Sequence, residues 1–134
     1  MPQTTNYSNK KFAITKLTKS IFKLETFEGI EVLQEDAMDM HHAFVTLSHG
    51  EKYAVLMDAT KYFSPSDKAR AKIASKQFTN TRYATAFVIT SLAIRLTANL
   101  FINFNKPATP SRIFNNETSA LEWLKEQEIR QYEK

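Results

Sequence analysis

Apolar residues follow two different repeats in the first half of the chain, and each repeat predicts one kind of element. Residues 12–17 and 20–25 alternate apolar and polar positions, which is typical of two half-buried strands that pair antiparallel. Over residues 33–47 the apolar positions recur every three or four residues, which predicts a helix with one buried face. Residues 53–57 are apolar without polar alternation, so we expect a central strand that is covered on both faces.

The second half of the chain continues with alternating helices and strands. We expect a helix over 64–77, a strand over 83–90, a helix over 92–104, a strand over 112–115 and a helix around 120–124. Ser64 is the expected N-cap of the first of these helices, because serine is a preferred cap and Pro65 suits the first turn. Each helix must bury its apolar stripe on a sheet, so this order predicts a small α/β domain.

The composition is that of a globular domain in a reducing compartment. The chain has 134 residues, of which 43% are hydrophobic, and it contains no cysteine, so disulfides and thiolate chemistry are excluded. Neither a signal-peptide pattern nor an apolar run of about 20 residues is found, which argues against a membrane span. We therefore expect one cytoplasmic domain over residues 1–134, with frayed ends at 1–10 and 128–134.

The net charge of +4 conceals blocks of opposite sign. Residues 1–24 carry five lysines and no acid, residues 25–60 carry eight acids and one lysine, and residues 61–106 carry eight basic residues and one acid. Such blocks are typical of solvated faces that attract one another across the surface. Nucleic-acid binding would require basic residues on one face together with stacking aromatics or a docking motif, and the sequence has neither. We therefore expect no nucleic-acid partner.

Several short motifs in the chain are those of one known family. They are Leu56-Met-Asp58, Ser64-Pro-Ser-Asp-Lys-Ala-Arg70, Ala98-Asn-Leu-Phe101, Asn105-Lys-Pro107 with Pro110, and Arg112-Ile-Phe114 followed by Ala120-Leu-Glu-Trp-Leu124. Through these motifs the chain, from about residue 12 to residue 125, resembles the bacterial STAS-like (SpoIIAA-like) domains, which include the anti-sigma-factor antagonists. The resemblance implies a four- or five-stranded mixed sheet with about four helices, mostly on one face. It also implies a regulatory or protein-interaction function and not a catalytic one.

The resemblance further points to a candidate regulatory surface between the central strand and the next helix. In the well-studied members, a serine at the start of that helix is phosphorylated. Here Asp58 and Thr60 match the first part of the motif, but Asp67 occupies the position of the serine. We expect constitutive binding of a protein partner at this surface, with its two serines as alternative phosphorylation sites; the other interpretation is an ion-pair cluster around a capped helix start. The surface consists of Asp58, Lys61, Ser64, Ser66 and Arg70.

The helix predicted over 92–104 supplies a second candidate surface. Its apolar residues cover more than a sheet-facing stripe, so it needs a further cover from another helix, a second subunit or a bound ligand. A homodimer that forms through this helix is therefore one hypothesis. The candidate ligand or subunit face consists of Arg95, Asn99, Phe101, Ile102 and Asn103.

These observations favour a non-catalytic protein-interaction module that regulates a partner or associates with itself. The alternative hypothesis is a carrier of a small amphipathic or lipid-like ligand in an apolar pocket under the helices. An enzyme would need a nucleophile with a base or converging carboxylates, and Asp58 is the only acid that we expect to be buried. His41, His42 and His49 lack metal-ligand spacing and are expected on helix surfaces, so we expect neither a metal nor a cofactor.

Overall fold

The computed structural model describes residues 5–61, 63–100, 102–103 and 109–133. Its strands are β1 (Thr5–Ser8), β2 (Phe12–Lys16), β3 (Ile21–Thr26), β4 (Ile30–Val32), β5 (Tyr53–Asp58), β6 (Phe63–Pro65), β7 (Arg82–Val88) and β8 (Ser111–Phe114). Its helices are α1 (Gln34–Leu47), α2 (Asp67–Ala74), α3 (Lys76–Thr79), α4 (Leu92–Leu100) and α5 (Glu117–Tyr132). The predicted α/β order is confirmed, and the short strands β1, β4 and β6 and the short helix α3 are additions to it.

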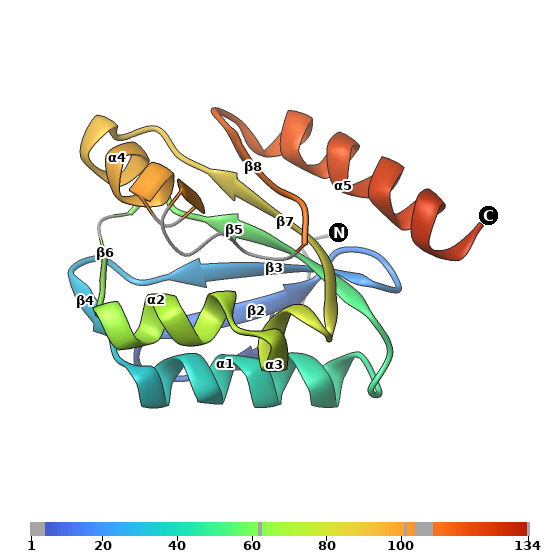
Figure 1. Ribbon diagram of the computed structural model, residues 1–134, viewed down its shortest axis with the longest axis horizontal. Helices are drawn as coiled ribbons and strands as arrows, with labels where there is room; N and C mark the ends of the chain where they lie inside the picture. The colour runs from blue at the N-terminus through green and yellow to red at the C-terminus, as the bar shows by residue number, and fades with distance from the viewer. Residues whose placement is uncertain (1–4, 62, 101, 104–108, 134) are drawn as a thin grey trace.

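Six strands form one mixed sheet in the order β1-β2-β3-β5-β7-β8 (Figure 1). The pairs β1–β2 and β2–β3 are antiparallel, whereas β3–β5, β5–β7 and β7–β8 are parallel. The sheet exceeds the predicted four or five strands because β1 pairs with β2, in a segment that we expected to be frayed. A separate parallel pair, β4 with β6, directly precedes α1 and α2 in the chain.

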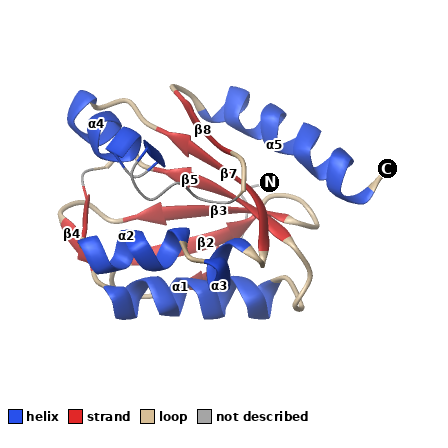
Figure 2. Ribbon diagram, in the orientation of Figure 1, coloured by secondary structure: helices blue, strands red, loops and turns tan. Residues whose placement is uncertain are grey.

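Helices cover both faces of the sheet, but unevenly (Figure 2). On β5, Tyr53, Val55 and Met57 pack into the core formed with α1, α2, α3 and α4. The alternate residues Ala54 and Leu56 pack on the opposite side, against α5. Two helices of the first face, α1 and α2, run side by side (Figure 1). The predictions that most helices lie on one face and that the central strand is buried on both faces are therefore confirmed.

The helix α1 follows the predicted periodicity. Ala37, Met40 and Phe44 lie on its buried face and join the core. Beyond its last turn, Gly50 adopts a φ of +78°, which glycine accepts without strain, and its N–H donates a hydrogen bond to the Val45 carbonyl at 3.0 Å. The predicted end of this helix is therefore confirmed.

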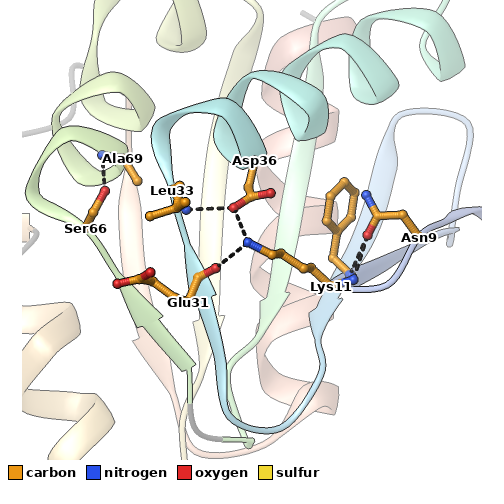
Figure 3. A network of polar contacts seen from close by, with 8 residues as sticks. Asn9, Lys11, Glu31, Leu33, Asp36, Ser66 and Ala69 are labelled. Carbon is orange, nitrogen blue, oxygen red and sulfur yellow. Dashed lines mark hydrogen bonds and ion pairs between the residues drawn. The ribbon is translucent and has the colours of Figure 1, made fainter.

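The start of α1 is held by Asp36, an acid of the first turn whose burial the sequence did not predict (Figure 3). The Asp36 carboxylate accepts hydrogen bonds from the Leu33 backbone N–H at 2.8 Å and from Lys11 Nζ at 2.7 Å. The same ammonium group donates to the Glu31 carbonyl at 2.9 Å. Asp36 is buried, whereas Asp58 is half-buried, so the expectation that Asp58 is the only buried acid is wrong.

The helix α2 begins later than predicted. Its N-cap is Ser66, whose Oγ accepts a hydrogen bond from the Ala69 N–H at 3.0 Å (Figure 3). Ser64 lies instead in β6, opposite Glu31 of β4. Both serines suit a cap, and the pairing of β6 with β4 decides between them. A break at Ser75 then separates α2 from α3.

The C-terminal helix is longer than predicted. We expected the chain to fray from residue 128, but α5 continues to Tyr132. Glu128 accepts hydrogen bonds from the hydroxyls of Thr18 and Ser20 at 2.7 and 2.5 Å. The hydroxyl of Tyr132 donates to the Lys52 carbonyl. These contacts attach the last turns of α5 to the loops at one end of the sheet.

The helix α4 is described only over part of its predicted length. It runs over Leu92–Leu100, and residues 102–103 follow in a wider, π-type turn. The rest of the helix predicted over 92–104, together with the exit segment at 105–108, lies outside the described residues. No helix in the described part of the chain combines the length and the hydrophobicity needed to cross a membrane.

Candidate functional site: a cavity under the helices

An apolar cavity of about 110 Å³ lies between the sheet and the helices of its first face. Its walls include Met40 and Phe44 of α1, Val55 and Met57 of β5, and Ile94 and Ala98 of α4. All six side chains are buried, and they belong to one core cluster. The carrier hypothesis requires a space of this kind, and the structure places it under the helices, where that hypothesis expected it.

One end of the cavity carries a buried cation. Arg82, the first residue of β7, lines the cavity and is 7% exposed. Its Nη2 donates a hydrogen bond to the Ile73 carbonyl at 2.6 Å, whereas its Nε is buried and has no partner among the described residues. None of the ion pairs within those residues includes Arg82. Burial lowers the pKa of Arg82, and only the nearby Tyr53 opposes this effect.

His41 of α1 lines the same cavity. Its ring stacks on Phe78 of α3 with 4.4 Å between the ring centroids, and its Nδ1 is buried without a partner in the described structure. Burial, followed by the positive charges of His42, Arg82 and Lys72, lowers the pKa of His41, so the imidazole is neutral at pH 7. The expectation that this histidine lies on a helix surface is wrong, because its side of α1 faces the core.

Two other polar side chains of the cavity wall lie at opposite ends. The hydroxyl of Tyr53 accepts a hydrogen bond from Thr81 Oγ1 at 3.2 Å, and its ring stacks on Phe44. Burial raises the pKa of Tyr53, so the phenol stays protonated. Thr26 ends β3 and is buried, and its hydroxyl has no partner among the described residues. Because β3, β5 and β7 are parallel, Thr26 lies at the end of the sheet opposite to Arg82.

The first predicted surface is divided among several local contacts. The Asp58 carboxylate accepts hydrogen bonds from the N–H and hydroxyl of Thr60 at 3.1 and 2.7 Å, and lies 3.8 Å from Lys23 Nζ. Lys61 is exposed. We expected Asp58, Lys61 and Arg70 to gather, but no hydrogen bond or ion pair joins them in the part of the chain that the structure describes.

The other members of that surface border α2. Ser64 is exposed in β6, and Ser66, the N-cap, lines an open groove between the first turns of α1 and α2. Arg70 pairs with Asp67 one turn earlier and borders the cavity. The five residues therefore do not form one cluster, and their role as a partner surface stays a prediction.

The described members of the second predicted surface lie on α4 and in the turn that follows it. Arg95 and Ile102 are half-buried, Asn99 and Asn103 are exposed, and Phe101 lies outside the described residues. The predicted helix also carries two leucines that the candidate face did not list, Leu92 and Leu96, which are 72% and 57% exposed. They lie one turn apart, on the side of α4 away from the cavity-lining Ile94 and Ala98. The spacing of four residues between these leucines could have identified them as one exposed apolar stripe.

Comparison with known families decides what the chain is. The profile of a domain of unknown function, DUF7793, matches residues 15–128, which is most of the chain. The chain belongs to the DUF7793 family. No match is found among curated proteins.

Among solved structures, this DUF7793 chain is similar to a crystal structure of an uncharacterised protein of the DUF3478 family from Shewanella loihica PV-4, described as having a SpoIIAA-like fold. The TM-score is 0.61 at 16% sequence identity, and the alignment covers 88% of this chain and 98% of the other. A likeness at this identity shows the fold alone. The predicted SpoIIAA-like fold is confirmed.

Arg82 and His41 are the polar residues of the cavity that sequence reasoning missed. For His41 the signal was available, because it lies four residues after Ala37 and three before Phe44, on the buried face of α1. The sequence around Arg82 contains no comparable pattern that would predict its burial. A charged residue that begins an apolar strand usually points into solvent, whereas Arg82 is buried and donates a hydrogen bond to the Ile73 carbonyl of α2.

Proposed function

We propose that this protein is a non-catalytic binding module that holds one small, largely apolar ligand in the cavity between the sheet and α1–α4. The observation that carries this proposal is the cavity itself, about 110 Å³ with apolar walls. An apolar cavity of about 150 Å³ in another protein stays dry and binds benzene. The ligand is therefore of the size of one ring or a short chain, and a long-chain lipid does not fit.

The polar groups of the wall support binding more than catalysis. A histidine that acts as a general base is normally paired with a nucleophile and oriented by a third group. Within the described residues the His41 ring contacts Phe78 and His42, and the residues that line the cavity include no carboxylate. Arginine stays protonated at neutral pH, so it cannot act as a general acid or base there. Arg82 therefore suits the orientation of a ligand better than its chemical conversion.

A neutral apolar probe tests the proposal. Toluene should raise the thermal midpoint in proportion to the logarithm of its concentration, because it binds only the folded state. It should also shift the methyl resonances of Met57 and Ile94, which line the cavity. Unchanged resonances and an unchanged thermal midpoint in the wild-type protein would contradict the proposal.

A cavity-filling variant sharpens this test. In Ala98→Met the new side chain occupies the cavity from α4, so toluene should no longer raise the thermal midpoint. The matched control is Ala71→Met, which adds the same side chain to the exposed face of α2. Toluene should stabilise this control as it stabilises the wild-type protein. Equal responses of the two variants would place the toluene elsewhere.

Self-association through α4 is a second candidate function, and the exposure of Leu92 and Leu96 favours it. If α4 forms the contact of a symmetric dimer, native mass spectrometry should show a doubled mass. Leu96→Glu should then give a folded monomer, whereas Ala71→Glu on α2 should leave the dimer intact. A wild-type protein that is monomeric at high micromolar concentration would overturn this second function.

A further inference from the structure

Two arginines border the cavity, and they differ in their counter-charge. Arg70 pairs with Asp67 and keeps part of its side chain in solvent. Arg82 is buried, and within the described residues its guanidinium donates to the Ile73 carbonyl but pairs with no carboxylate. Buried charges in native proteins are normally paired, because an isolated ion in an apolar interior is costly. A ligand in the cavity would therefore supply the negative charge that pairs with Arg82.

His41 provides a second donor for the same anionic group. Its Nδ1 is buried and has no partner in the described structure, and the charge of Arg82 acts on its ring. A neutral imidazole can place its proton on Nδ1 and donate from there. Arg82 and His41 thus both line the cavity, and each has one buried nitrogen atom, Nε and Nδ1 respectively, with no partner in the described structure. Buried groups of this kind require an explanation in a native structure.

The charge and the volume of the site define the ligand further. One guanidinium matches the single negative charge of a carboxylate and its planar, two-oxygen geometry. A phosphate dianion would bring nearly twice that charge and more acceptors than these donors satisfy. The apolar remainder of the ligand must fit about 110 Å³.

We propose that the ligand is a small apolar carboxylic acid, bound as its carboxylate, with the charged end on Arg82 and His41. Its apolar part extends toward α4, because α4 follows the far end of β7 and Arg82 begins that strand. This inference rests on the proposed function, since the cavity must take the apolar part. It adds the charge of the ligand, its orientation and the residues that hold its anionic end.

The test compares probes of equal shape and different charge on the wild-type protein. Isothermal titration measures benzoate against benzamide and pentanoate against pentanamide, with toluene as the neutral apolar reference. Each carboxylate should bind about tenfold or more tightly than its amide, because a charge-assisted hydrogen bond in an apolar site accounts for at least that factor. In ¹⁵N spectra the Arg82 Nε–H resonance should shift with benzoate and remain in place with toluene.

Matched variants assign the anionic end. Arg82→Met should abolish the preference for carboxylate and keep toluene binding, whereas Arg70→Met should retain the preference. If Arg82→Met fails to fold, the wild-type affinity ratio and the Arg82 Nε–H resonance still decide the question. Loss of the preference in Arg70→Met together with its retention in Arg82→Met would overturn the assignment to Arg82.

The outcomes separate this inference from the proposed function. Toluene binding together with equal affinities for carboxylate and amide would overturn the anionic end and leave the apolar cavity as a binding site. Absence of binding by every probe would overturn both. Tight benzoate binding without a shift at Arg82 Nε–H would place the carboxylate outside the cavity and would also overturn the inference.

Discussion

The two faces of the sheet are covered by helices in different ways. On the α5 face the contact includes small side chains that let the helix approach the strands closely, and Leu56 and Leu124 are fully buried there. These small residues are Ala54, Ala84, Ala86 and Ala120. On the opposite face large side chains such as Phe44 and Met57 surround the cavity. Protein interiors are normally close-packed, so a space among large side chains needs an explanation that the alanine-rich face does not.

The polar groups of the two faces differ in the same way. On the α5 face the Ser20 hydroxyl contacts the Tyr83 hydroxyl at 2.8 Å and donates to Glu128 at 2.5 Å. On the cavity face the buried polar atoms without a partner in the described structure belong to Thr26, His41 and Arg82. Satisfied groups stabilise a fold, whereas unsatisfied ones are retained at a cost. The α5 face thus pairs its polar groups, whereas the cavity face leaves donors that our proposal assigns to a ligand.

An ion pair on the α5 face is a further example of paired polar groups on that face. Lys23 Nζ lies 2.8 Å from a Glu117 carboxylate oxygen at the start of α5. Partial burial of Lys23 opposes its charged form, but the hydrogen bond and charge of Glu117, together with the charges of Asp58 and Glu25, raise the pKa of Lys23. Each charge in this contact has its partner, unlike Arg82 on the other face.

The largest expected effect tests the close packing of the α5 face. Leu124→Ala should lower the free energy of unfolding by about 2–5 kcal/mol, because Leu124 is fully buried and the truncation leaves a cavity. Leu121→Ala, one turn earlier at a half-buried position, is the matched control and should cost clearly less. Urea unfolding measures both. Equal losses would show that α5 does not pack on the sheet through Leu124.

The next prediction concerns the polar network of the same face. Glu128→Ala should lower the free energy of unfolding by about 1–3 kcal/mol, because the hydroxyls of Thr18 and Ser20 lose their charged acceptor. Glu126→Ala, at an exposed position of the same helix, should change stability by less than about 0.5 kcal/mol. If Glu128→Ala is as harmless as its control, the C-terminal turns of α5 are frayed, as the sequence suggested.

The third prediction compares the loss of a paired polar group on the α5 face with the loss of an unpaired polar group on the cavity face. Tyr83→Phe removes a paired hydroxyl from the α5 face and should cost about 1 kcal/mol. Arg82→Met removes an unpaired buried charge along with one hydrogen bond to a carbonyl, so stability should change by less than about 1 kcal/mol or increase. Thermal and urea unfolding compare the two variants. A loss of several kcal/mol in Arg82→Met would contradict this stability prediction and show that Arg82 also stabilises the fold.

The elements that the sequence predicted correctly are those with a long local pattern. The helix α1 shows its period over fourteen residues, and β5 has an uninterrupted apolar run between two paired strands. By contrast, β4 and β6 are three residues long and exist through their pairing with each other, which no local pattern reveals. That pairing also moved the N-cap from Ser64 to Ser66.

The candidate site was predicted only in outline. A pocket under the helices followed from the resemblance and from the excess of apolar residues in α4, but its volume depends on how side chains from α1, β5 and α4 meet. The inward direction of Arg82 involves a segment outside its own strand, because its guanidinium donates a hydrogen bond to the Ile73 carbonyl of α2. Such features arise from contacts between distant segments, and one sequence without relatives carries no signal for them.

The smallest expected effect is a pH dependence that only the cavity face should show. Burial lowers the pKa of His41 below its ordinary value of 6.5, and the charges of His42, Arg82 and Lys72 act in the same direction. The unfolded chain therefore binds a proton at this residue more readily than the folded protein does. The contribution of His41 to stability is present above pH 6.5 and is lost as the pH falls from there through the lower pKa of the folded state.

The measurement is the difference in unfolding free energy between pH 7.5 and pH 5.5 for the wild-type protein and two matched variants. His41→Gln should show a smaller loss on acidification than the wild-type protein, whatever its absolute stability, because the titrating group is gone. His42→Gln, at the exposed neighbouring position, should keep most of the wild-type dependence. If the two variants respond alike, the His41 imidazole is not the group that the cavity keeps neutral. The contrast between the two faces would then rest on Arg82 and Thr26.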